Sequence, residues 1–205
     1  MSGAEVSSSG ERLPAPVIAG GMTLTEALAR RRSQREFTGA GLTREQLGQL
    51  CWAAQGITSP EGFRTAPSAG AILPFTVLVV GGDGVFVYRP EVHTLEPHVP
   101  DDVRLALQAA CLDQPCVGSA PVVFVLAADL RRMEAKYGRR AEYYGLLEAG
   151  HIAQNLLLQA AALGLGGVPV GAFRERQVAQ AVQLSRPMRP LYLVPVGHPR
   201  FPAAS

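Results

Sequence analysis

Lysine is almost absent from this chain of 205 residues. Of its 19 basic residues only Lys136 is a lysine, which leaves 18 arginines. Because 17 acidic residues nearly balance them, the formal charge is only +2, and no basic run is longer than the triplet at 30–32. A balance this weak argues against a nucleic-acid partner.

Cysteines and uninterrupted apolar runs are also scarce. Cys51, Cys111 and Cys116 have neither a C-x-x-C nor a zinc spacing, so we expect reduced, partly buried thiols in a cytoplasmic protein. The N-terminus lacks the basic start and apolar stretch of a signal peptide. The most apolar stretch, 149–165, is interrupted by polar side chains, which favours a buried helix over a membrane span.

With 47% apolar and 18% charged residues, the chain can bury a core. We expect a mobile, Ser-rich tail over residues 1–12 and one folded domain over 13–205. Strands and helices interleave without a regular βαβ rhythm, which favours an α+β sandwich. Helices are predicted over 23–32, 43–56, 101–114, 140–163 and 175–184, and strands over 75–80, 85–88, 121–127 and 191–197.

The glycine-rich segment 164–171 follows a predicted helix and precedes a strand. A dinucleotide-binding fingerprint needs the opposite order, because the pyrophosphate must meet a helix N-terminus. The segment is therefore interpreted as a helix C-cap and turn. The chain also contains no Walker A motif and no G-x-S-x-G, which argues against P-loop and α/β-hydrolase chemistry.

Glu148, His151 and Asn155 share one face of the predicted helix 140–163. A single E-x-x-H could be half of a di-iron site, but that chemistry needs two such motifs. A helix-packing network, for example at a subunit interface, is the better interpretation, and no metal is expected.

The segment Arg30 to Arg35 carries the strongest local signal. Arg31, Ser33 and Arg35 alternate, so in an extended segment they point the same way. Guanidinium groups with a hydroxyl could hold a phosphate. The alternative is a solvated basic helix end that complements the helix dipole.

Five segments in order resemble the FMN-dependent nitroreductase superfamily, and specifically its SagB-type (thiazole/oxazole-forming) dehydrogenase branch. They are LTEALARRRSQREF at 24–37, RTAPSAGAILP at 64–74, VFVYRPEVHTL at 85–95, KYGRRAEYYGLLEAGHIAQNLLLQAAALGLGGVPVGAF at 136–173 and PLYLVPVGHPR at 190–200. The classical nitroreductase branch usually has an Asn where Ala71 stands, a departure that favours the SagB-type branch.

The resemblance implies an α+β fold with a mixed β-sheet flanked by helices, assembled as an intertwined homodimer with FMN at the interface. Burial at that interface would explain why the second half of helix 140–163 is apolar nearly all round. It also implies the binding groups. They are Arg31, Arg32, Ser33 and Arg35 for the ribityl phosphate, Arg200 for a second phosphate contact, Pro67, Ser68, Ala69 and Gly70 at the ring from the partner chain, and main-chain groups of Val170, Gly171 and Ala172 along the ring.

Lys136 and Tyr137 match the Lys-Tyr pair associated with azoline oxidation in that branch. Lysine, unlike arginine, can act as a base near neutral pH in a suitable environment. The leading hypothesis is an FMN-dependent dehydrogenase that acts on an azoline or related C–N unit of a natural product, with biosynthetic partner enzymes. The alternatives are an NAD(P)H-dependent nitro- or quinone reductase, a flavin-bound accessory subunit, and, for the pair, an ordinary surface position.

Overall fold

A seven-stranded sheet forms the centre of the molecule in the computed structural model, which describes residues 10–201. The strand order is β1-β4-β3-β2-β5-β7-β6, and every ladder is antiparallel. A parallel pairing occurs at a single bridge, between Ser33 and Gly167. The strands are β1 (Glu11–Arg12), β2 (Phe75–Gly81), β3 (Gly84–Arg89), β4 (Thr94–Val99), β5 (Val122–Ala128), β6 (Gly166–Gly167) and β7 (Arg189–Gly197).

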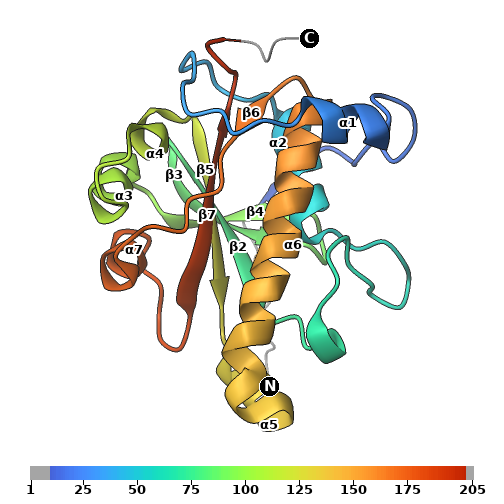
Figure 1. Cartoon of the computed structure of the whole chain (residues 1–205), viewed down its shortest axis with the longest axis vertical. Helices are drawn as coiled ribbons and strands as arrows, with labels where there is room; N and C mark the ends of the chain where they lie inside the picture. The colour runs from blue at the N-terminus through green and yellow to red at the C-terminus, as the bar shows by residue number, and fades with distance from the viewer. Residues whose placement is uncertain (1–9, 202–205) are drawn as a thin grey trace, which may run out of the picture.

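Helices cover both faces of this sheet (Figure 1). The bounds are α1 (Leu24–Arg30), α2 (Arg44–Gln55), α3 (Arg104–Ala110), α4 (Pro115–Ser119), α5 (Arg131–Tyr137), α6 (Ala141–Ala162) and α7 (Glu175–Ala181), with 3-10 turns η1 (Ala69–Ala71) and η2 (Gly138–Arg140). One core joins α2 and α6 to the sheet, and the other joins α3, α4 and α7 to its opposite face. The predicted α+β class is confirmed.

The alternation of side chains along the strands produces these two cores. In β2, Val77 and Val79 belong to the core under α6, whereas Leu78 and Val80 belong to the core on the other face. Every residue of β5 is buried, as expected for a central strand whose two faces are both covered. The prediction of a strand at 121–127 is therefore confirmed.

Residues at the helix N-termini mark where two of the predicted helices begin. Thr23 and Thr43 both form capping boxes, with Glu26 and Gln46 respectively. The long helix predicted over 140–163 is α6. Its second half is not buried all round in the single chain, because His151 and Gln154 are exposed.

Three elements differ from the expectations. These three are β4, which was not predicted, α5, which includes the Lys-Tyr pair that was placed ahead of a helix, and the helix predicted over 101–114, which is shortened to α3; the short elements α4, β1 and β6 were not predicted either. In the tail predicted over 1–12, Glu11 and Arg12 pair with β4, and residues 1–9 lie outside the described residues. No helix between residues 10 and 201 is long and apolar enough to cross a membrane.

Candidate functional site

The loop between α2 and β2 is bent into a conformation that side chains seldom adopt. Gly70, Ala71 and Leu73 have positive φ angles of 61°, 54° and 52°. Glycine tolerates this region, but alanine and leucine meet a steric cost of about 1–2 kcal/mol each. Backbone strain of this kind persists only where surrounding contacts enforce it, and it concentrates at functional sites.

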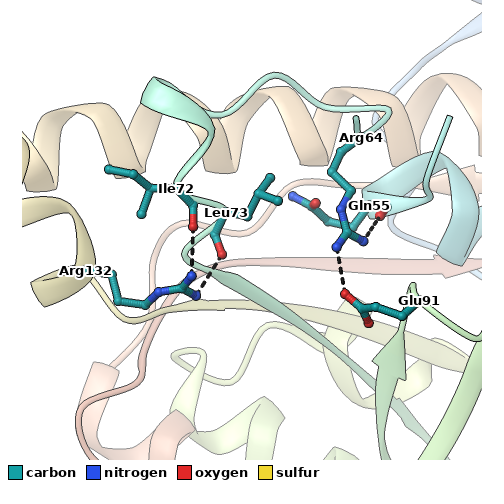
Figure 2. Close-up of polar contacts among 6 residues, drawn as sticks. All are labelled: Gln55, Arg64, Ile72, Leu73, Glu91 and Arg132. Carbon is teal, nitrogen blue, oxygen red and sulfur yellow. Dashed lines mark hydrogen bonds and ion pairs between the residues drawn. The ribbon is translucent and has the colours of Figure 1, made fainter. Parts of the chain in front are cut away.

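Two arginines fix the ends of this loop (Figure 2). Arg132, from α5, donates to the carbonyl oxygens of Ile72 and Leu73 at 2.9 and 3.0 Å. Arg64 donates to the carbonyl of Gln55 at 3.1 Å and pairs with Glu91 at 2.8 Å. A planar guanidinium suits such paired contacts, so the loop is fastened to α5 at one end and to α2 at the other.

A buried carboxyl holds the middle of the loop. Ser68 Oγ donates to Glu148 Oε2 at 2.7 Å and accepts from the Leu73 N–H at 3.0 Å. Burial raises the pKa of Glu148 to about 7, while the hydrogen bond from Ser68 and the nearby backbone N–H of Ala69 act in the opposite direction. Two turns further along the same helix face, Asn155 donates to the Thr65 carbonyl at 3.1 Å.

Lys136 and Tyr137, at the end of α5, lie directly over this loop. A Cβ atom added to Gly70 would come within 2.6 Å of both Lys136 Nζ and Tyr137 Oη. The Tyr137 ring stacks edge-on against Tyr144, with centroids 4.8 Å apart. Lys136 is exposed and Tyr137 is half-buried. The structure thus brings together the Lys-Tyr pair and the Pro67–Gly70 loop, which the sequence analysis had treated separately.

The arginine segment lies elsewhere, against the edge of the sheet. The Gln34 N–H donates to the Gly167 carbonyl at 3.0 Å, and the Arg200 N–H donates to the Glu36 carbonyl at 3.0 Å. A side chain at Gly166 would meet Gln34 at 2.6 Å, so this close approach requires glycine. Residue 200 is thereby brought next to residues 31–36, as the two predicted phosphate contacts require.

The side chains of that segment are not equivalent. Arg31 is half-buried, while Ser33 and Arg35 are exposed and bound to no other side chain among the described hydrogen bonds. Arg32 folds back to donate to the carbonyls of Ala29 and Arg31 at 2.9 and 2.8 Å. It therefore neutralises the C-terminal end of α1, which was the alternative interpretation for this cluster.

Main-chain groups at 170–172 are only partly free. Val170 exchanges both of its backbone hydrogen bonds with Leu193, at 2.8 and 3.1 Å. The carbonyl of Ala172 accepts from Gln114 at 2.9 Å, and Gly171 and Ala172 are exposed. Of the three predicted ring contacts, Val170 has its polar main-chain groups committed to the sheet.

The turn with Lys136 and Tyr137 lies beside the first half of α6, and the arginine segment lies near the C-terminal end of that helix (Figure 1). The η1 turn packs beside Glu148, whereas α1 and β6 lie near the end of the helix at Ala162. At 1.5 Å per residue, these two points are about 20 Å apart along the helix axis. One chain therefore separates the predicted phosphate-binding residues from the loop with Lys136 and Tyr137.

Sequence reasoning missed several residues of this site. It assigned no role to Arg64 or Arg132, and it treated Glu148 only as part of a packing network. Glu148 and Asn155 do form packing contacts, but with the loop, and His151 is exposed. Residues 10–201 contain no group of His, Cys, Asp and Glu that could hold a metal ion. The sequence signal that could have identified Glu148 is its position as an acidic residue among apolar neighbours in α6.

Comparisons with known proteins relate this chain to the nitroreductases. Residues 28–198 match the model of the nitroreductase family. A protein of Methanocaldococcus jannaschii named as a nitroreductase is 39% identical over 180 residues, which is 85% of this chain and 90% of that protein. A Ralstonia eutropha structure, likewise named as a nitroreductase, has a TM-score of 0.86 at 33% identity and covers 93% of this chain and 90% of its own. The FMN reductase (NAD(P)H) of Bacillus subtilis is 25% identical over 188 residues, 85% of this chain and 65% of its own length.

Proposed function

This chain belongs to the nitroreductase family of oxidoreductases, and we propose that it is an FMN-dependent dehydrogenase of an azoline or related C–N unit in a peptide-derived or other natural product. The observation that carries the proposal is the contact of Lys136 and Tyr137 with the strained turn at Gly70. Two residues that can act together as a base, at a loop that would face a flavin, suit dehydrogenation, because that reaction removes a hydride and a proton together.

The chain has groups that fit each part of FMN. Arg31, Ser33 and Arg35 would hold the phosphate, with Arg200 beside them, and arginine suits a phosphate dianion. The Pro67–Gly70 turn is exposed at Pro67 and Gly70 and lacks large side chains, so a flat ring could approach its backbone. Gly171 and Ala172 would line the ring from the phosphate side.

The distance between these groups supports a dimer with the flavin between two copies. The ribityl chain of FMN is much shorter than the roughly 20 Å that separates the two clusters along α6, so a second copy would supply the Pro67–Gly70 turn. Apolar surface is available for that contact. Tyr143, Leu146 and Leu147 on α6 are 61%, 51% and 45% exposed, and Leu24 on the adjacent α1 is 67% exposed.

A groove beside these helices strengthens the case for a second copy. It lies between α1, α2 and α6, has a volume of about 370 Å³, and includes apolar side chains from all three helices. An obligate interface of this kind typically buries about 2,000 Å² or more. Light scattering should return a dimer for flavin-loaded protein, and a flavin-loaded monomer of 21.7 kDa would contradict the proposal.

In the proposed reaction, FMN supplies the oxidised ring that accepts the hydride, and dioxygen is the final electron acceptor. Lys136 and Tyr137 would take the proton from the substrate atom next to the carbon that loses the hydride, so that a double bond forms between those two atoms. Two residues whose polar atoms converge on one point can share that proton and act as a unit. The turn at Gly70 and the stacked Tyr144 fix the position of this pair.

The test uses purified protein, reconstituted with FMN and given an azoline-containing peptide. Lys136→Ala and Tyr137→Phe should retain FMN but lose about 10²–10⁴-fold in oxidation rate, the usual range for removal of a general base. Arg139→Ala, an exposed neighbour in the same segment, is the control and should keep the rate. Full activity of both variants on an azoline that the native enzyme oxidises would reject the role of the pair.

The second candidate is an NAD(P)H-dependent nitro- or quinone reductase, favoured by what the relatives in M. jannaschii, R. eutropha and B. subtilis are named. Such an enzyme needs no base, because solvent supplies the protons. Stopped-flow mixing with NADPH distinguishes the two functions. Rapid bleaching of the flavin that is unaffected by Lys136→Ala would favour the reductase.

A further inference from the structure

Glu148 stands apart from the other charged residues. Among residues 10–201 it is the only charged side chain that is buried, with 2% of its surface exposed. No arginine, lysine or histidine in that range forms an ion pair with it. Its Oε1 atom is also buried and has no hydrogen-bond partner. A buried carboxyl without a cation is strongly disfavoured in its charged form.

The second oxygen of Glu148 is connected to the strained part of the loop. The hydroxyl hydrogen of Ser68 goes to Glu148 Oε2, and the hydroxyl oxygen accepts from the Leu73 N–H. This pair of bonds ties Glu148 to a residue whose φ angle is positive without being glycine. Opening of the loop would break both bonds and expose the carboxyl to water.

We propose that Glu148 is a positioning residue that, in its neutral form, holds the Ser68–Leu73 turn closed against α6 and that releases the turn when it ionises. The closed turn is the one that carries Gly70 to Lys136 and Tyr137. The role assigned to that turn rests on the proposed function, but the link between proton binding and closure does not, because it needs no flavin.

The direction of the effect follows from linkage. Burial raises the pKa of Glu148 in the closed state to about 7 from an ordinary value of 4.5, which the exposed carboxyl of an open loop would regain. The closed state therefore binds the proton more tightly, so protonation favours closure. This advantage is complete below pH 4.5 and is lost as the pH rises through 7. Between pH 6 and pH 8 the opening equilibrium should increase about tenfold.

Other groups near the turn must be considered as sources of a pH effect. His151 is one of them, and it lies one turn from Glu148 on the exposed side of α6. The remaining titratable or charged groups from the packed elements are Lys136, Tyr137 and Arg132 of α5, Tyr144 of α6 and Cys51 of α2.

The experiment measures amide hydrogen exchange of the peptide covering 66–75 in the full-length, flavin-free protein at pH 6 and pH 8. Exchange is corrected for its intrinsic pH dependence with an unfolded reference peptide. We expect protection in the native protein to fall about tenfold at pH 8. Glu148→Gln, which stays neutral, should keep the same protection at both pH values. His151→Gln, the matched control, should behave as the native protein does.

Two results would overturn the proposal: equal protection of the native loop at both pH values, or a pH dependence that survives in Glu148→Gln. If Glu148→Gln does not fold, Ser68→Ala provides the second test. That variant removes the connection to Leu73, so protection should fall at both pH values, and unchanged protection would count against the proposal. Failure to bind FMN would reject the proposed function alone, since exchange is measured without flavin.

Discussion

Gly70 offers the sharpest test of whether the turn and the Lys-Tyr pair form one site. Its φ and ψ angles are 61° and 19°, in the left-handed region. Alanine can adopt this region at a cost of about 1 kcal/mol relative to glycine. Gly70→Ala should therefore lower the free energy of unfolding only slightly on account of its backbone.

The new methyl group has a larger effect on its neighbours. It would start 2.6 Å from Lys136 Nζ and Tyr137 Oη, and ordinary contact begins at 3.4 Å, so these atoms must retreat by about 0.8 Å. The end of a lysine moves easily, but Tyr137 is held by its stacking on Tyr144. A displacement of about 1 Å at a reacting group can cost about 10²-fold in rate. We expect a loss of that order in turnover.

The control is Gly164→Ala. Gly164 also has a positive φ, of 71°, but a Cβ there would meet no atom within 4 Å. Chemical denaturation should show similar losses of stability for both variants, while the oxidation rate falls only in Gly70→Ala. Combining Gly70→Ala with Lys136→Ala should add little to the loss from Lys136→Ala alone. Full turnover by a folded Gly70→Ala would refute the idea that this contact is part of the reaction site.

Three further outcomes are expected. Replacing Arg31 and Arg35 together by alanine should abolish most FMN retention, measured by fluorescence titration, because each charged contact to phosphate is worth roughly 1.5–3 kcal/mol; unchanged affinity would move the phosphate site elsewhere. Arg132→Gln should lower the free energy of unfolding by about 1–2 kcal/mol, because it removes two hydrogen bonds to loop carbonyls, whereas Arg131→Gln, which loses a single exposed ion pair, should change it by less than about 1 kcal/mol. The buried thiols should not react with a thiol reagent at pH 8 until the protein unfolds, since burial raises the pKa of Cys111 to about 12; rapid labelling of the native protein would contradict this.

The elements that sequence reasoning predicted well are those with signals in adjacent residues. The helix predicted over 43–56 begins with a capping box of Thr43 and Gln46, three residues apart. The strands predicted over 75–80 and 85–88 pair with each other across the short turn at Gly81–Gly84. In both cases the determining contacts join residues close in sequence, so the pattern contains the information.

Strand β4 shows where that reasoning fails. Its sequence, Thr94–Val99, contains Glu96, Pro97 and His98, none of which indicates a strand. Its pairing partners are β1 and β3, and a register shift between Val85 and Phe86 accommodates the irregular ladder. The sheet therefore imposes extended structure on residues whose own preferences are weak, and only the tertiary fold reveals it.

The candidate site divides in the same way. The resemblance identified Lys136, Tyr137 and Gly70 separately, but their contact depends on α5, which no local pattern had indicated. The bonds that fasten the loop join residues far apart in the chain, such as Ser68 to Glu148. Contacts between residues so far apart in the chain produce no recognisable spacing pattern in a single sequence. The supporting contacts of a site are consequently the part that needs a structure.

The long helix is the reason we propose that a second copy completes the flavin site. Glu148 and Asn155 bind the loop to one stretch of α6, while the arginine segment is fixed by Gly167, beyond the other end of the helix. A 22-residue helix is about 33 Å long, and within one chain it holds the two clusters apart along its axis. A second copy, with its helix running in the opposite direction, would place the loop of one chain beside the arginines of the other. Dimerisation would then be a requirement of cofactor binding, so a variant that disrupts the exposed leucines of α6 should lose FMN and the dimer together.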